Sequence, residues 1–213
     1  MKNARSRQVS PATVLVWDVP VRVFHWLLAV CFAGAYLTSE SEDWRLVHVT
    51  LGYTMAGLIV FRLVWGFIGS RYARFSDFVR GPAAAASYLR SLLHGKPQHF
   101  LGHNPAGALA ILGLLALGAA TAATGWIVLQ ESSAELWEEV HETFANLMLA
   151  LVLIHIAAVI VSSRLHHENL VAPMFSGVKH GQPEQAIRRG WCSIGLLVLL
   201  VVAVFWWLQW KMS

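Results

Sequence analysis

Five stretches of this 213-residue chain are long and apolar enough to cross a bilayer as helices. A spanning helix needs roughly 17–25 residues, and charged side chains are nearly confined to the segments between these stretches. The pattern predicts an all-α integral membrane fold in a single domain over residues 1–213. The expected spans are Val21–Thr38, Val47–Gly69, Pro105–Leu129, Val140–Ser163 and Trp191–Trp210.

The composition supports lipid as the solvent for most of the chain. Hydrophobic residues make up 56% of the sequence and charged residues 13%, whereas soluble domains have about 25% charged residues. No Cys-x-x-Cys-His motif is present, which excludes covalent c-type haem attachment. Cys31 and Cys192 each lie in an apolar stretch and are interpreted as core residues.

The distribution of Lys and Arg predicts the orientation of the chain. Basic residues concentrate at the N-terminus and in the second and fourth connections, whereas the first and third connections are acidic, so the N-terminus is expected in the cytoplasm and the C-terminus outside. This placement assigns the net charge of +4 to loops beside anionic lipid and excludes nucleic acid as a partner. The basic residues are Lys2, Arg5, Arg7, Arg22, Arg71, Arg74, Arg80, Arg90, Lys96, Arg164, Lys179, Arg188 and Arg189. The acidic connections contain Glu40, Glu42 and Asp43 beside the single Arg45, and Glu131, Glu135, Glu138 and Glu139.

The second connection contains a short helix between Pro82 and Gly95. Pro near a helix start and Gly just past its end favour this interpretation, and Tyr88 with three leucines indicates an amphipathic helix on the cytoplasmic membrane surface. Asn104 and Pro105 are expected to begin the third span as cap and first turn.

Four of the ten histidines fall inside the spans: His25, His48, His141 and His155. Ionisable groups at membrane depth are functional candidates, although a single histidine there is more often an interhelical hydrogen-bonding residue. The alternating direction of the helices places His25 and His155 toward the cytoplasm, and His48 and His141 toward the outside.

The spacing on the fourth span supports two layers. His141 and His155 are 14 residues apart, close to four turns, which puts both on one helix face roughly 21 Å apart. Each layer has two imidazoles from different helices, as axial ligation of one haem iron requires. We therefore predict two b-type haems, held by His25 with His155 and by His48 with His141. Gly34, Gly52, Gly57, Gly113 and Gly118 would let a macrocycle or a neighbouring helix approach, and the sequence favours neither.

Several motifs together resemble the bacterial cytochrome b-561 family, and most of all its nickel-iron hydrogenase b-type cytochrome branch. They are Arg22-Val23-Phe24-His25-Trp26, His48-Val49-Thr50-Leu51-Gly52-Tyr53, residues 61–75, Gly102–Gly107, and the pair His141 and His155. The resemblance covers about residues 14–165. It implies a four-helix haem-binding core with bis-histidine haems linked to a quinone, and leaves the span at 191–210 as a peripheral helix, with Trp206, Trp207 and Trp210 as interfacial anchors.

Other polar residues remain open to two interpretations. Arg62 lies 14 residues after His48 and either pairs with a propionate of the inner haem or extends to the headgroups; Arg22 has the same two possibilities. Glu138, Glu139 and Glu142 form either a dock for a basic partner or a solvated loop. His103, His166 and His167 are expected as solvated residues at the cytoplasmic edge, and His94, His99 and His180 as loop residues.

The function expected from these features is electron transfer in a bacterial cytoplasmic membrane. Two histidines on each iron leave no open position for oxygen, so one-electron transfer to or from a quinone is favoured. The family implies an outer partner such as a cytochrome c, a hydrogenase or superoxide. The alternatives are a haem-free histidine-lined transporter or proton path, against which the uninterrupted spans argue weakly, and a structural membrane anchor for an enzyme complex.

Overall fold

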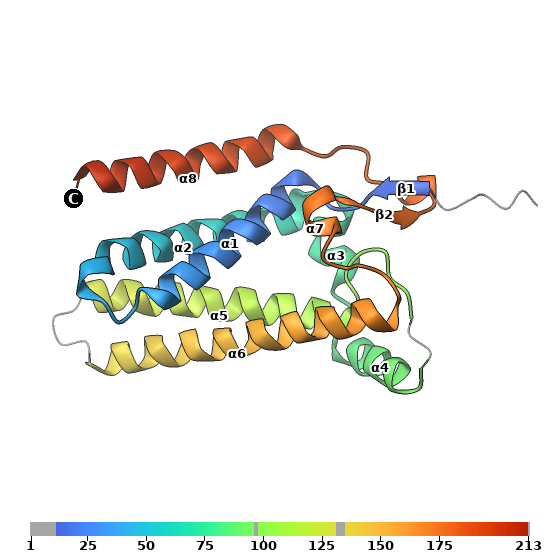
Figure 1. The fold of residues 1–213 in the computed structure, drawn as a ribbon, viewed down its shortest axis with the longest axis horizontal. Coiled ribbons are helices and arrows are strands. Elements are labelled where there is room, and N and C mark those ends of the chain that lie inside the picture. Colours follow the sequence, from blue (N-terminus) through green and yellow to red (C-terminus); the bar gives the residue numbers. More distant parts are fainter. Residues whose placement is uncertain (1–11, 96–97, 131–134, 213) are drawn as a thin grey trace, which may run out of the picture.

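The computed structural model describes residues 12–95, 98–130 and 135–212, and in them five helices are long and apolar enough to cross a membrane. Successive spanning helices run in opposite directions along the long axis of the molecule (Figure 1). This confirms the all-α membrane fold. The helices are α1 (Val19–Leu37), α2 (Arg45–Ile68), α5 (Pro105–Gln130), α6 (Glu135–Leu165) and α8 (Cys192–Met212).

The expected boundaries were close except at the start of α6, which begins at Glu135 rather than Val140. Glu135 and Glu138 lie in its first turn, where the positive end of the helix dipole favours carboxylates, so the polar residues extend the helix. Lys2, Arg5, Arg7, Lys96 and Glu131 lie outside the described residues.

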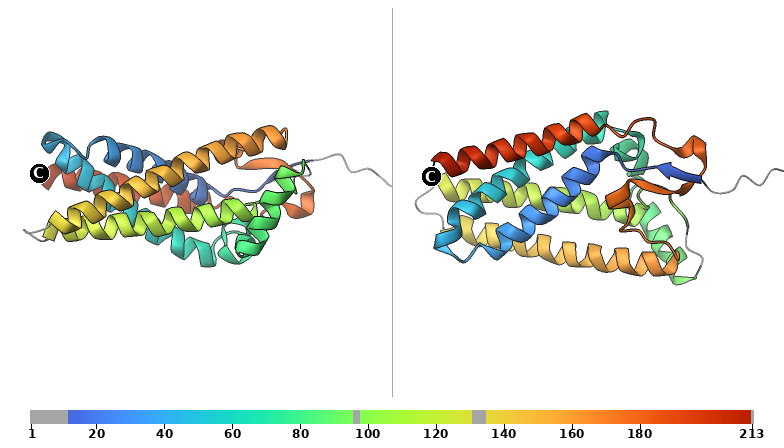
Figure 2. Two further views of the ribbon diagram at one scale, coloured as in Figure 1. Left: turned by 90° about the horizontal axis from the view of Figure 1, so that it is seen from below. Right: turned by 45° about the horizontal axis from the view of Figure 1, so that its top comes forward.

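Neighbouring helices pack in the order α1, α2, α5, α6, and α8 lies along α1 on the other side (Figure 2). Between the two levels of histidines, side chains from α1, α2 and α6 form a buried apolar layer. Met148 lies in it, seven residues from each histidine of α6. The members of this layer are Cys31, Phe32, Ala35, Leu51, Met55 and Met148.

One end of the bundle is covered by a folded cap made of residues 12–18, 71–95, 98–104 and 166–191. It contains β1 (Ala12–Leu15) and β2 (Val178–Gly181), which pair antiparallel with Ala12 opposite Gly181. It also contains α3 (Phe75–Phe78), α4 (Pro82–Leu93), α7 (Pro173–Ser176) and 3-10 turns at Arg71–Ala73 and Pro183–Gln185. The prediction of His180 as a loop residue is wrong, because it lies in β2; strands of four residues give too short a pattern to detect.

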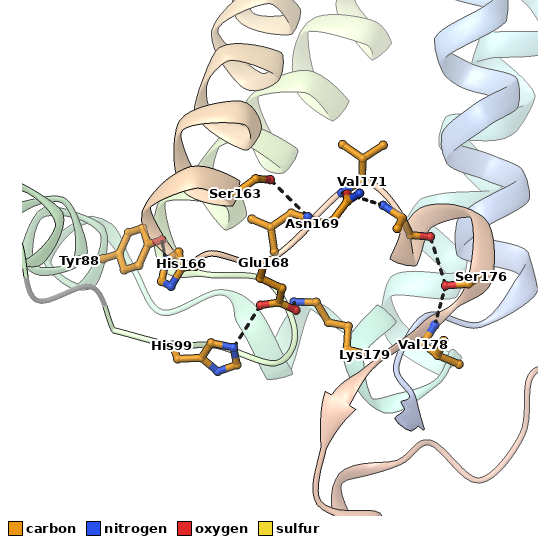
Figure 3. Close-up of polar contacts among 12 residues, drawn as sticks. Tyr88, His99, Ser163, His166, Glu168, Asn169, Val171, Ser176, Val178 and Lys179 are labelled. Atoms are coloured by element: carbon orange, nitrogen blue, oxygen red, sulfur yellow. Dashed lines mark hydrogen bonds and ion pairs between the residues drawn. The ribbon is translucent and has the colours of Figure 1, made fainter. Parts of the chain in front are cut away.

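Charged side chains hold the cap against the end of α6. The carboxylate of Glu168 lies 3.4 Å from Nζ of Lys179 and 3.2 Å from Nε2 of His99 (Figure 3). Only 4% of the Lys179 side chain is exposed, so its ammonium needs this partner. The contact joins β2 and the 98–104 segment to the residues that follow α6.

Helix α4 occupies the expected residues and packs on α5. Gly81 has a φ of 82°, a conformation that favours glycine, and Pro82 then begins the helix. Tyr88 is buried, and its hydroxyl lies 3.3 Å from Nε2 of His166 (Figure 3). Asn104 also caps α5 as expected, since its Oδ1 accepts from the backbone N of Gly107 at 2.7 Å.

Asp18 joins the start of α1 to the end of α2. One carboxylate oxygen accepts from the backbone N of Val21 at 2.8 Å, and the other from Nε1 of Trp65 at 3.0 Å. The residue is fully buried, and the charge of Arg62 is close enough to attract it. A helix N-cap and an interhelical hydrogen bond therefore depend on one carboxylate.

Helix α8 packs closely against α1 and α2. A Cβ on Gly195 would lie 2.5 Å from a methyl carbon of Val19, so glycine permits the close approach of α8 to α1. Trp206, which was expected as an interfacial anchor, donates from Nε1 to Oγ1 of Thr54 on α2 at 2.8 Å. This hydrogen bond ties the outer half of α8 to α2, and the expectation of an interfacial anchor stays a prediction.

We expect Asp18→Ala to lower the free energy of unfolding in detergent micelles by about 2–3 kcal/mol, because it removes a cap and leaves the Trp65 indole N–H unpaired. The matched control is Asp77→Ala, whose carboxylate makes an exposed ion pair with Arg71 at 3.6 Å and should change the stability by less than about 1 kcal/mol. Equal losses in the two variants would show that Asp18 does not join the helices.

Candidate functional site

The histidines nearest the uncapped end of the bundle, His48 and His141, face each other as a pair, here called the far-side pair. Their ring centroids are 6.2 Å apart with an interplanar angle of 77°. Metal–nitrogen bonds of about 2.0 Å on opposite sides of one ion place two imidazole centroids roughly 6 Å apart. The separation therefore fits two axial ligands of one iron.

Backbone carbonyls fix the tautomer of both far-side rings. Nδ1 of His48 lies 2.8 Å from the carbonyl oxygen of Ala35, and Nδ1 of His141 lies 2.9 Å from that of Thr121. Since a carbonyl oxygen only accepts, each Nδ1 carries the proton and each Nε2 is left with its lone pair free for a metal.

One turn of α5 forms the support for His141. Besides the Thr121 carbonyl, Oγ1 of Thr124 lies 3.3 Å from Nδ1 of His141. A Cβ on Gly125 would lie 2.8 Å from Cε1 of His141, so only glycine lets the ring approach the helix this closely. Thr121, Thr124 and Gly125 were not predicted, because nothing along the chain marks which threonine or glycine will face a histidine on the next helix.

The second pair, His25 and His155, lies toward the cap and is called the cap-side pair. The two residues are close enough for their charges to repel, and the edge of His25 contacts Trp26 with 5.0 Å between centroids. Nδ1 of His25 is buried and has no hydrogen-bond partner among the described residues. An unpartnered buried nitrogen is costly in this setting, and this distinguishes His25 from the two far-side histidines, whose Nδ1 atoms lie on carbonyl oxygens.

Two arginines stand beside the cap-side pair. Arg62 is 2% exposed, and its guanidinium lies 5.1 Å from the ring centroid of Phe75, so the alternative of extending to the headgroups is wrong. Arg22 donates from Nη1 to the carbonyl oxygen of Phe175. Nη1 of Arg62 and Nε of Arg22 are buried without a hydrogen-bond partner in the described part of the chain. Unsatisfied donors of this kind fit an acidic group such as a haem propionate.

His103 was expected to be a solvated residue, and that expectation is wrong. Its ring packs between Trp17 and Phe78, with centroid distances of 4.5 and 4.9 Å. Loss of hydration, followed by repulsion from Arg62, lowers the pKa of His103 to about 3. The charges of both cap-side histidines also act on it, so His103 lies close to that pair.

The remaining candidates are the acidic residues at the start of α6 and the glycines of the spanning helices. Glu138, Glu139 and Glu142 are exposed near the uncapped end. The glycines expected beside a macrocycle or a helix also differ: Gly34, Gly113 and Gly118 contact side chains of neighbouring helices, whereas a Cβ on Gly52 would meet nothing within 4 Å. Gly52 is one turn from His48, so the open space lies on the same face of α2 as the far-side ligand.

Together these features are those of a membrane b-type cytochrome, in which histidines on spanning helices hold a non-covalent haem. The chain belongs to the prokaryotic cytochrome b561 family, whose sequence profile matches residues 16–177. This confirms the resemblance: the chain is a multi-pass bacterial membrane protein of a b-type cytochrome family.

Similar proteins are hydrogenase-associated cytochromes. The chain is 27% identical over 145 residues to the probable Ni/Fe-hydrogenase 1 B-type cytochrome subunit of Escherichia coli (strain K12), covering 55% of this chain and 61% of that protein. It is 23% identical over 219 residues to the probable Ni/Fe-hydrogenase B-type cytochrome subunit of Bradyrhizobium diazoefficiens, covering 80% and 87%. The chain thus spans about three fifths of the length of the Escherichia coli relative. No solved structure matches it.

The lowered pKa of His103 predicts an acid-sensitive fold. Between about pH 3 and 6.5 the unfolded chain binds a proton at this residue that the folded protein does not, so stability is lost as the pH falls through this range. The melting temperature of His103→Phe should therefore fall less between pH 7 and pH 4 than that of the unmodified protein. The exposed His180→Phe serves as control and should follow the unmodified protein; a matching slope for His103→Phe would contradict the prediction.

Proposed function

We propose that this chain is a di-haem cytochrome that carries electrons between the quinone pool and a redox partner at the outer face of the cytoplasmic membrane. The observation that carries the proposal is the far-side pair, with 6.2 Å between ring centroids and both Nδ1 atoms bonded to carbonyls. A second pair, His25 on α1 with His155 on α6, supports a second haem.

The residues proposed to act are four histidine ligands and two arginines. His48 with His141, and His25 with His155, would occupy both axial positions of each iron. Arg62 and Arg22 would pair with propionates of the cap-side haem through their buried, unpartnered nitrogens. Bound in this way, the haems supply one-electron carriers with no open coordination position, which favours electron transfer over oxygen chemistry.

The orientation proposed is cap toward the cytoplasm, with the C-terminus outside. The cap carries Lys179 and most of the basic connections, which are retained on the cytoplasmic side of membrane proteins. The exposed carboxylates Glu138, Glu139 and Glu142 then lie near the far-side pair at the outer face, where they suit a basic partner. The names of the relatives support an enzyme subunit of the hydrogenase type as that partner.

Haem pairing is tested by removing one ligand at a time. Purified protein should contain two haems per chain; His25→Ala and His155→Ala should each lose the same low-spin signal in optical and electron paramagnetic resonance spectra. His48→Ala and His141→Ala should each lose the other signal. His94→Ala, at the residue that follows α4, is the control and should keep both. A colourless folded protein, or a shared loss in His25→Ala and His48→Ala, would contradict the proposal.

The proposed contact between Arg62 and a haem propionate is tested by removing the charge of the side chain. Arg62→Met keeps the length of the side chain but removes the cation, which should weaken retention of the cap-side haem by about 2–5 kcal/mol, as for loss of one member of a buried ion pair. Haem content measured through successive detergent washes should fall from two toward one, with the far-side signal unchanged. Arg71→Met, at an exposed ion pair, is the control; equal retention in both variants would exclude a propionate contact at Arg62.

A further inference from the structure

The two histidine pairs differ in how their non-ligating nitrogens are held, and this inference rests on the proposed function. On the far side, His48 and His141 each donate from Nδ1 to a backbone carbonyl. On the cap side, Nδ1 of His25 is buried without a partner within residues 12–95, 98–130 and 135–212. The two iron sites would therefore have ligands of different basicity.

A hydrogen bond from Nδ1 to a carbonyl makes the other nitrogen of the imidazole a stronger electron donor. A stronger donor stabilises the oxidised iron more than the reduced iron, which lowers the reduction potential. Both far-side ligands have this bond, and His141 has a further acceptor in Oγ1 of Thr124. The Thr124 hydroxyl itself donates within α5, with the carbonyl oxygens of Ala120 at 2.8 Å and Thr121 at 3.1 Å as its acceptors.

Charge acts in the same direction. Arg62 is buried near the cap-side pair together with the carboxylate of Asp18, which offsets part of its charge, and Arg22 adds a second cation, so positive charge is in excess there. Cations in a region of low dielectric constant favour the reduced iron, which carries one positive charge fewer. At the far-side end, Glu138, Glu139 and Glu142 lie on α6, and Glu42 and Asp43 precede Arg45 at the start of α2. Carboxylates therefore outnumber the cation at this end and favour the oxidised iron.

The support for His141 is built into α5, which runs beside α6 along the bundle (Figure 1). The Thr121 carbonyl and the Thr124 hydroxyl accept from its Nδ1, and Gly125 lacks the Cβ that would lie 2.8 Å from Cε1. This turn touches no candidate ligand except His141, so its residues act through the histidine and position it.

We propose that the α5 turn Thr121–Gly125 tunes the far-side haem to a lower reduction potential than the cap-side haem. An electron that leaves a reduced far-side iron for an oxidised cap-side iron then moves downhill, from the outer face toward the cap. Thr121, Thr124 and Gly125 are positioning residues for this property.

The test is a potentiometric titration of the purified two-haem protein followed by its visible spectrum. Each potential is assigned with His25→Ala, which leaves the far-side haem, and His48→Ala, which leaves the cap-side haem. Thr124→Val should raise the reduction potential of the far-side haem by up to about 59 mV, which is a tenfold change in its one-electron reduction equilibrium. The potential of the cap-side haem should not change. Thr54→Val, which removes a hydroxyl bonded in the same way to the carbonyl four residues before it, should shift neither.

Gly125→Ala provides the second variant. The added methyl group should displace the His141 ring from the Thr121 carbonyl, raise the far-side potential, and change the ring-nitrogen couplings of the oxidised haem in electron–nuclear resonance spectra. Gly57→Ala, where a Cβ would meet nothing within 4 Å, should leave both unchanged.

The outcomes separate this inference from the proposed function. Fewer than two haems in the unmodified protein would overturn the proposed function. Two haems with equal potentials, or with the far-side haem higher, would overturn only the inference. A Thr124→Val variant with an unchanged far-side potential would remove the role of the α5 turn.

Discussion

An imidazole inside a spanning helix has two ring nitrogens and no water to satisfy them. One nitrogen carries a proton that needs an acceptor, and the other has a lone pair that needs a donor or a metal. In the far-side pair, helix carbonyls satisfy the protonated nitrogens of His48 and His141, and the lone pairs are left for a common ligand. Both contacts depend on the packing of α6 on α5 and of α1 on α2, which brings each ring to a carbonyl of the neighbouring helix.

The carbonyls that take part are accessible because of their place in the helices. Ala35 lies in the last turn of α1, where its carbonyl oxygen has no i+4 helical N–H close by, only the longer contacts from Thr38 at 3.2 and 3.3 Å, and so accepts from His48 at 2.8 Å. Thr121 lies within α5, where its carbonyl accepts from His141 beside the close approach permitted by Gly125. A single helix end and a single glycine thus orient two histidines from other helices.

The cap gives the other end of the bundle a different environment. Asp18 and Trp65 fix the junction of α1 and α2, and Glu168 with the buried Lys179 fixes β2 beneath α6. These polar contacts enclose Arg62 and the ring of His103, so charge and aromatic surface gather on one side of the bundle. The asymmetry between the two ends is a property of the cap and of the loops that form it.

The sequence by itself determined the spans, their alternating direction and the two depths at which the histidines lie. Length, hydropathy and helix period are properties of single segments, so they can be read along the chain. The tertiary structure decided the burial of Arg62, the aromatic packing of His103, the β1–β2 sheet, and the contact of the α5 turn Thr121–Gly125 with His141. Each of these depends on residues far apart in sequence meeting across a helix interface, and an interface leaves no periodic signal in either partner alone.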